Sequence, residues 1–268
     1  MGQPDGQRVD VRLDERPQGV VATVVIDNAG RLNTLNSALM EQFVEVLAPL
    51  ATQETLRALV ITGAGDKAFV GGADINEMNA IRDPAAARSF ITRVHACCAA
   101  IRSIPVPTIA RIQGFALGAG LELAAACDLR IASQTATFGM PEVKLGIPSV
   151  VEAALLPMLI GWGRTRQMLL LGETFGAQQA LAWNLVEQVT PPDELDSAIQ
   201  ICIGQLLNSK PRAVRLQKSL IRAWEDLSTQ EAIQAGIDAF AAAFDTDEPQ
   251  IAMHEFLAAH AARRKPGA

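Results

Sequence analysis

Residues 113–128 have the sequence QGFALGAGLELAAACD, a glycine-bearing turn that runs directly into an apolar segment. The glycines between Gly114 and Gly120 indicate a tight turn, because glycine adopts backbone conformations that other residues avoid. The alanines and leucines that follow predict a buried helix through Ala126. Short runs at Thr108–Ile112 and Asp128–Ala132 flank this unit, and both are predicted strands.

The residues before this unit continue the alternation of strands and helices. The runs Val20–Ile26 (VVATVVI) and Ala58–Thr62 (ALVIT) are β-branched, end near Gly or Asn, and predict buried strands. Apolar residues at helical spacing predict a helix over Asn36–Ala51, and a second long helix ends near Ser103. Strands separated by helices favour an α/β fold with a mostly parallel sheet covered by helices.

The pattern changes after Leu185–Val189, the last strand-like run. Pro191 and Pro192 interrupt the chain, and the remaining residues are helical in pattern, with predicted helix starts near Pro211 and Ser228. We therefore expect a core over residues 1–195 and a helical region over residues 196–268. This region is a candidate for packing over the core or against another subunit.

Composition excludes several classes of protein. The 268 residues include 23 Lys and Arg against 29 Asp and Glu, a formal net charge of −6, and 49% are hydrophobic. An acidic chain with 4% aromatic residues and no Tyr argues against a nucleic-acid partner. The first eleven residues have no apolar signal region, and no apolar run reaches the ~20 residues of a membrane span. The four cysteines match no zinc or redox spacing, so we expect a soluble cytoplasmic protein without a metal site.

The candidates for acid–base chemistry are carboxylates, because the three histidines lie in helical segments away from the glycine turns. Glu122 is surrounded by Leu, Ala and Gly, and a carboxyl buried there must be paired or take up a proton. The alternative is an exposed residue on an otherwise buried helix. Glu142 follows the segment FGMP (138–141) and by itself resembles an ordinary loop residue.

Two glycine turns offer backbone N–H groups. The first is FVGGADI (69–75) and the second is GFALGAG (114–120). Neither matches a dinucleotide-binding or phosphate-loop motif. Together they could form an oxyanion hole, and separately each could serve only tight packing.

These segments in combination resemble the crotonase family, the enoyl-CoA hydratase/isomerase superfamily, over most of the chain. The segments that resemble it are LNTLN (32–36), AFVGGADINEM (68–78), QGFALGAGLELAAACD (113–128), FGMPEVKLGIP (138–148), GET (172–174) and ALAWNLV (180–186). The resemblance implies a crotonase-like spiral of ββα units with a C-terminal helical region. It also implies a homotrimer, or a dimer of trimers, formed through that region.

The resemblance implies enoyl-CoA hydratase activity, the addition of water across the C2=C3 bond of a 2-enoyl-CoA thioester. The N–H groups of Ala73 and Ala119 fall where the family forms its oxyanion hole, and Glu122 and Glu142 fall at the two catalytic glutamates. Glu122 is expected to activate the water and Glu142 to supply the C2 proton. CoA would enter as part of the substrate, without a further cofactor or metal. Residues assigned to CoA binding are Leu32, Val70, Gly72, Asp74, Ile75 and Gly118, although Asp74 could instead only shape its loop.

Three segments depart from the family pattern. Residues 149–157 (SVVEAALLP) replace the glycines that hydratases commonly have beside the acyl pocket, and they introduce Glu152. Glu152 is either a third active-site carboxylate or an acid favoured in the first turn of a helix. Asn184 replaces a glycine, a mild change because Asn tolerates the left-handed conformation. The basic residues 263–265 are either a solvated terminus or contacts for CoA phosphates of a neighbouring subunit.

Two alternatives to hydration stay open, and Glu152 with the altered 149–154 segment supports the first of them. One is another crotonase reaction on an acyl-CoA: double-bond isomerisation, hydrolysis or C–C cleavage. The other is a relative that binds acyl-CoA without turnover, against which the presence of both glutamates argues.

Overall fold

The computed structural model describes residues 6–263. The chain forms two compact units, Met1–Ile203 and Gly204–Ala268. The expected boundary between residues 195 and 196 stays a prediction. Arg264 and Lys265, and the side chain of Arg263, lie outside the described residues.

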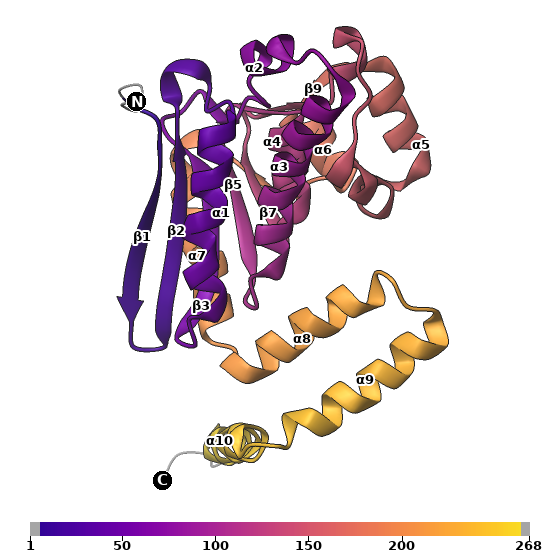
Figure 1. The fold of residues 1–268 in the computed structure, drawn as a ribbon. Helices are drawn as coiled ribbons and strands as arrows, with labels where there is room; N and C mark the ends of the chain where they lie inside the picture. Colours follow the sequence, from indigo (N-terminus) through magenta and orange to yellow (C-terminus); the bar gives the residue numbers. More distant parts are fainter. Residues whose placement is uncertain (1–5, 264–268) are drawn as a thin grey trace. The chain divides into compact units, whose positions relative to one another are not determined.

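A six-stranded sheet forms the centre of the first unit (Figure 1). Its order is β1 (Arg8–Arg16), β2 (Gly19–Asp27), β3 (Leu56–Gly63), β5 (Thr108–Ile112), β7 (Leu129–Ser133) and β10 (Gln188–Thr190). The β1 edge strand is antiparallel to β2, and the remaining neighbours are parallel. The prediction of a mostly parallel sheet is confirmed. Every residue of β3 is buried, as expected for a strand covered on both faces.

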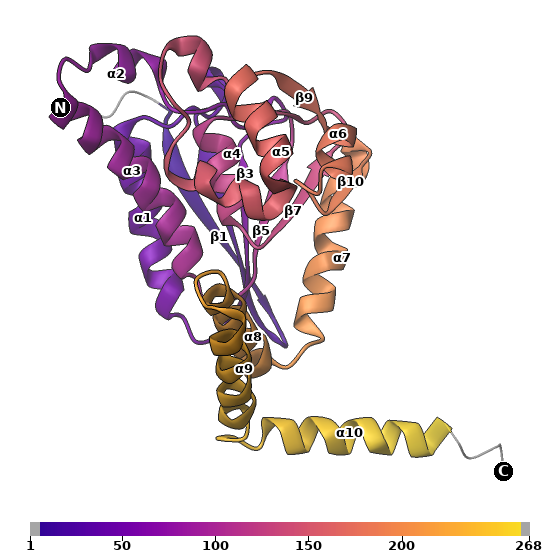
Figure 2. The same cartoon turned by 90° about the vertical axis from the view of Figure 1, so that its right-hand side faces the viewer.

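Helices cover both faces of this sheet. Two of them, α1 (Ser37–Thr52) and α3 (Pro84–Ser103), lie side by side on one face, and α7 (Leu195–Leu207) lies on the other (Figure 2). The Asn36 side chain caps α1 by accepting a hydrogen bond from the Leu39 N–H at 2.9 Å. Asp83 caps α3 in the same way, and Pro84 occupies its first turn, where a proline is tolerated.

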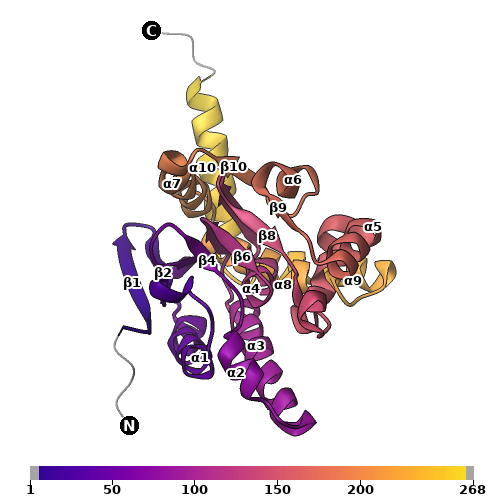
Figure 3. The same ribbon diagram turned by 90° about the horizontal axis from the view of Figure 1, so that it is seen from above.

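A second, smaller sheet was not predicted from the sequence. It has the order β4 (Ala68–Val70), β6 (Phe115–Leu117), β8 (Thr137–Gly139) and β9 (Thr174–Gly176), and β9 is antiparallel to β8 (Figure 3). The β4 and β6 strands lie inside the two glycine-rich segments that were predicted as turns. Each has three residues, too few to show the alternation that identifies a strand. Their parallel pairing places the two glycine turns next to each other.

The remaining elements of the first unit are short, apart from α5. They are η1 (Ala29–Arg31), α2 (Ile75–Ala80), α4 (Ala119–Ala126), η2 (Glu142–Leu145), η3 (Val151–Leu155), α5 (Leu156–Leu171), α6 (Ala177–Ala182) and η4 (Pro192–Glu194). Asn184 follows α6 with a φ of 62°, so the left-handed conformation expected for it is confirmed.

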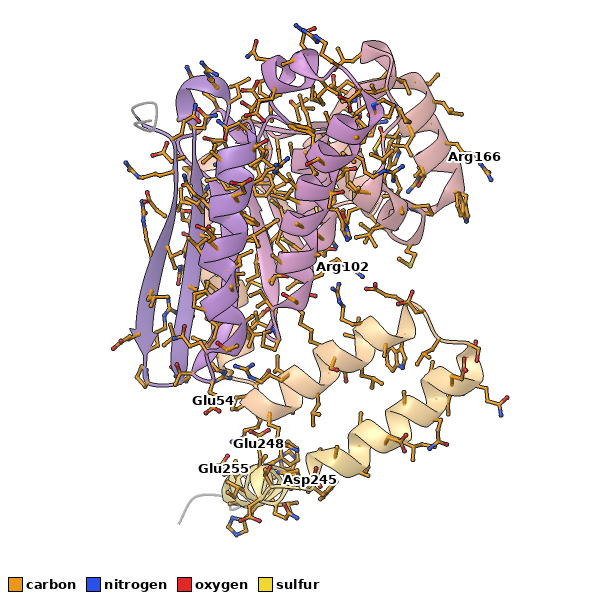
Figure 4. The ribbon with its side chains drawn as sticks, viewed as in Figure 1. Glu54, Arg102, Arg166, Asp245, Glu248 and Glu255 are labelled. Atoms are coloured by element: carbon orange, nitrogen blue, oxygen red, sulfur yellow. The ribbon has the colours of Figure 1, made fainter. Side chains whose placement is uncertain are left out.

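The second unit contains α8 (Pro211–Trp224), α9 (Thr229–Ala243) and α10 (Glu248–Arg263), so both predicted helix starts are confirmed. Ser228 and Glu231 form a capping box at the start of α9. Glu248 accepts hydrogen bonds from the backbone N–H groups of Arg212 and Ala213. Figure 4 labels Glu248 and Glu255 of α10 and Asp245, which precedes this helix. Among the helices described in residues 6–263, none is long and apolar enough to cross a membrane.

Candidate active site

A cavity of about 810 Å³ opens in the first unit between α2, α3, the start of α4 and residues 141–150. Much of its wall is apolar, but it also contains two carboxyl side chains, Glu122 and Glu142. Residues singled out from the sequence that line it are Gly72, Ala73, Ile75, Gly118, Ala119, Glu122 and Glu142. The other four, Leu32, Val70, Asp74 and Glu152, are not among its lining residues.

The Ala73 N–H is available on the cavity side of its loop. Leu35 and Ala73 form a parallel bridge, in which Leu35 N donates to Gly72 O at 2.9 Å and Asp74 N donates to Leu35 O at 2.8 Å. This pattern turns the N–H and C=O of Ala73 itself away from Leu35. No acceptor for that N–H is found among residues 6–263.

The Ala119 N–H is the second donor. Ala119 begins α4, and the N–H groups of a first helical turn have no intrahelical acceptor. Gly118 precedes it with a φ of 51°, and a Cβ there would lie 2.4 Å from Glu142 Oε1. Only glycine fits this position, because the backbone is left-handed and a carboxyl oxygen occupies the space. Gly120 lets α4 approach β4, since a Cβ would lie 2.0 Å from Val70 O.

The Glu122 carboxyl is buried, with 4% of the residue exposed. Its pKa is raised from 4.5 to about 8: burial is the largest cause, the negative charges of Glu142 and Glu152 also raise it, and the nearby Ala153 backbone lowers it. The apolar sequence around Glu122 therefore belongs to a buried carboxyl and not to a residue on an exposed helix face.

Glu142 is half-buried and opens the short helix η2. Ser149 Oγ donates a hydrogen bond to Glu142 Oε2 at 2.8 Å, which fixes the orientation of the carboxyl group. Ser149 was not among the site residues predicted from the sequence. Its only signal was its place at the start of the segment that departs from the family pattern, and that signal does not predict a contact across seven residues.

Glu152 is buried and bonded to a histidine. Its Oε1 lies 2.8 Å from His95 Nδ1, and the residue is 7% exposed within η3. The sequence offered two readings of Glu152, a third active-site carboxylate or an acid in the first turn of a helix. Glu152 does occupy the first turn of a short helix, but neither reading included its contact with His95 of α3. His95, which the sequence placed as an ordinary helix residue, holds it there.

Three residues assigned to CoA binding by resemblance have structural contacts of their own. Asp74 is buried and caps α2, accepting hydrogen bonds from Asn76 N at 2.7 Å and Glu77 N at 3.2 Å. These bonds favour the loop-shaping role for Asp74. Leu32 has a left-handed φ of 55°, and its C=O accepts a hydrogen bond from Gly71 N at 2.8 Å. Val70 is fully buried in β4.

Comparisons with known proteins identify what the chain resembles. The family model described as enoyl-CoA hydratase/isomerase matches residues 16–266. The short-chain-enoyl-CoA hydratase of Clostridium acetobutylicum is 34% identical over 241 residues, covering 90% of this chain and 92% of the relative. The crotonyl-CoA hydratase of Syntrophomonas wolfei is 34% identical over 238 residues, covering 88% and 91%. The crystal structure of an enoyl-CoA hydratase from Bacillus anthracis superposes with a TM-score of 0.87 at 30% identity, covering 97% and 98%.

Proposed function

The chain belongs to the enoyl-CoA hydratase/isomerase family, and we propose that it is an enoyl-CoA hydratase that adds water across the C2=C3 bond of a 2-enoyl-CoA thioester. One observation supports this most strongly. Glu122 and Glu142 line the same cavity as Ala73 and Ala119, whose N–H groups have no acceptor in the described structure. Two carboxyl groups and two N–H donors thus line one cavity, which supports the proposal.

The two N–H groups would bind the thioester oxygen. As water adds to C3, electron density moves through the conjugated system onto that oxygen, which gains enolate character. Backbone donors aimed at the developing charge stabilise it, and loss of one such donor typically costs about 3 kcal/mol. The helix dipole of α4 adds to this effect, because Ala119 lies at its positive end.

The two carboxyl groups would share one water and one proton. We assign water activation to Glu122 and delivery of the C2 proton to Glu142. With its pKa raised to about 8, Glu122 gains the charged form needed by a base as the pH rises through that value. Two carboxyls and two N–H donors supply all that hydration requires, so the proposed reaction uses no further cofactor, and CoA enters as part of the substrate.

The rest of the cavity suits an acyl chain. Its wall includes Phe90, Ile91 and Val94 from α3, together with Ile147 and Val150 from the altered segment. We keep CoA binding assigned to Leu32, Val70, Gly72, Ile75 and Gly118, of which Gly72, Ile75 and Gly118 line the cavity, and we assign Asp74 to shaping its loop. Because Glu152 is held by His95 and is not among the lining residues, the argument for a different reaction through a third carboxylate loses its support.

The test is hydration of crotonyl-CoA, measured as loss of the enoyl absorbance, with the product identified by mass. We expect turnover by the unaltered protein and a loss of several orders of magnitude in both Glu122→Gln and Glu142→Gln. A folded protein that binds CoA esters without forming a 3-hydroxyacyl product would refute the proposal. A product of unchanged mass with a shifted double bond would instead identify an isomerase.

The helical region is proposed as the trimerisation region of a homotrimer or a dimer of trimers. Large apolar side chains on α9 and α10 are exposed in the single chain: Ile233, Ile237, Phe240, Phe244, Met253, Phe256 and Leu257. Such exposure is typical of surfaces that associate. Light scattering after gel filtration should give three or six times the 28.6 kDa mass. The four free cysteines fit the reducing conditions of a cytoplasmic location, which we also propose.

A further inference from the structure

The cavity contains a charged side chain that the hydration of a simple enoyl thioester does not use. It is Arg88, which lies on α3. The α3 residues that line the cavity are Pro84, Ala87, Arg88, Phe90, Ile91 and Val94. Steps of three and four residues place most of them on one face of the helix. Arg88 therefore belongs to the face that α3 presents to the cavity, and it is the charged member of that set.

The Arg88 guanidinium has no partner within residues 6–263. The backbone C=O of Arg88 accepts a hydrogen bond from Thr92 Oγ1 at 2.8 Å, but the side chain forms no ion pair or hydrogen bond with that part of the chain. The other cation that lines the cavity, Lys144, is paired with Glu173 at 2.7 Å. Arg88 is thus the cation of the described cavity wall that is free to bind an anion.

The position of Arg88 along α3 places it at the outer end of the wall assigned to the acyl chain. Val94 is fully buried and Phe90 is 7% exposed, whereas Arg88 is exposed, so this face of α3 runs from the interior to the opening of the cavity. The helix packs against α4, which carries Glu122. At a rise of about 1.5 Å per residue, Arg88 lies about 9 Å along the helix from Val94. An acyl chain that starts beside Glu122 and follows this face toward the opening therefore ends close to Arg88.

The charges in the cavity favour an anion at Arg88 rather than beside the glutamates. Glu122 and Glu142 also line the cavity, and each carboxyl group disfavours a further negative charge nearby. A guanidinium, by contrast, can bind a carboxylate through two parallel N–H···O hydrogen bonds. None of the residues assigned to CoA binding lies on α3, so the anion expected at Arg88 belongs to the acyl group and not to a CoA phosphate.

We propose that Arg88 determines substrate specificity by binding a carboxylate at the far end of the acyl group, so that the preferred substrates are 2-enoyl-CoA thioesters of dicarboxylic acids. This inference rests on the proposed function, since it names the substrate class of the same site. Arg88 does not touch the reacting atoms, and its effect is on the binding and choice of substrate. An uncharged acyl chain of the same length lacks this contact, because its end offers the guanidinium no acceptor.

The first experiment compares the kcat/KM of hydration for charged and uncharged substrates. The charged ones are 4-carboxy-2-butenoyl-CoA and 5-carboxy-2-pentenoyl-CoA, and the uncharged ones are crotonyl-CoA and 2-hexenoyl-CoA. We expect the unaltered protein to prefer at least one charged substrate. Arg88→Gln should lower kcat/KM for that substrate at least about fivefold, as expected for loss of a charge-assisted hydrogen bond at a partly exposed site, and should change it for the uncharged substrates less than about twofold.

Two further variants sharpen this comparison. Arg88→Lys keeps the positive charge and should keep most of the preference for the charged substrate. Arg93→Gln is the matched control, because Arg93 is an α3 cation outside the cavity lining that pairs with Glu41 at 3.1 Å, and it should leave the preference unchanged. An equal loss for charged and uncharged substrates in Arg88→Gln would overturn the proposal and assign Arg88 to the CoA part of the substrate. No loss for any substrate would also overturn it, since Arg88 would then be only a solvated side chain.

The second experiment measures binding alone, with saturated thioesters that cannot be hydrated. Isothermal titration calorimetry compares adipyl-CoA, which ends in a carboxylate, with hexanoyl-CoA, which has the same chain length. Adipyl-CoA should bind more tightly to the unaltered protein, and Arg88→Gln should remove the difference. Equal binding of the two thioesters by the unaltered protein would overturn the proposal. If the unaltered protein hydrates none of the four enoyl substrates, the proposed function fails, whereas this binding difference still decides whether Arg88 recognises a carboxylate.

Discussion

Replacement of Glu122 by Gln should make the protein progressively more stable than the unaltered form as the pH rises. In the folded protein the pKa of Glu122 is raised from 4.5 to about 8, first by burial and then by the negative charges of Glu142 and Glu152. A raised pKa means that the folded state holds the proton more tightly than the unfolded state does. Its stabilising effect is complete below pH 4.5 and is lost as the pH rises to about 8. Gln cannot ionise, so the variant lacks this loss.

The magnitude follows from the two pKa values. At about 1.36 kcal/mol per pKa unit, the rise corresponds to a total of about 5 kcal/mol. Between a pH of about 5.5 and a pH of about 8.5, the difference in unfolding free energy between variant and unaltered protein should grow by about 3 kcal/mol. Any fixed effect of the amide on packing or hydrogen bonding adds a constant and does not change this slope.

Urea unfolding at several pH values, at one fixed protein concentration, measures the difference. The concentration must be constant because the stability of an oligomer depends on it. Glu122→Met is the matched second variant, since Met also cannot ionise but offers no hydrogen bond, and it should show the same slope. If the difference in unfolding free energy from the unaltered protein stays constant with pH in both variants, the conclusion that folding raises the pKa of Glu122 is refuted.

Three further outcomes are expected. The kcat/KM of hydration should rise with pH through about 8, because Glu122 must ionise to act as the base. A kcat/KM that falls over this pH range would mean that Glu122 acts as the acid and Glu142 as the base. Ser149→Ala removes the 2.8 Å hydrogen bond to Glu142, so kcat should fall about tenfold in steady-state assays while the melting temperature changes little. Arg130→Met removes a 3% exposed cation that is paired with Glu187, and denaturant unfolding should show a loss of about 3 kcal/mol. If the Arg130→Met variant and the unaltered protein have the same free energy of unfolding, the ion pair adds no stability beyond that of a packed side chain of similar size.

Much of the larger sheet could be predicted because its signals are local. The β-branched run of β2 and the apolar spacing of α1 lie within single elements, and both were found close to their observed bounds. The edge strand β1 was missed, because its sequence RVDVRLDER is largely exposed and charged. The three-residue strands β4 and β6 were missed for a different reason, since they are held by neighbours from distant parts of the chain.

Glu122 and Glu142 could both be selected from the sequence because they match a known family's motif. Glu122 had a second signal, since a carboxyl among Ala, Leu and Gly must be paired or protonated when it is buried. Their chemistry depends on contacts that no local pattern contains. Ser149 reaches Glu142 only because residues 142–149 fold back on themselves, and His95 meets Glu152 across 57 residues. Amino-acid type and spacing thus establish the fold family and the reactive groups, because periodicity and motifs are properties of neighbouring residues. The raised pKa of Glu122, the free N–H groups of Ala73 and Ala119, and the contact between Glu152 and His95 arise only when folding removes water and brings distant segments together.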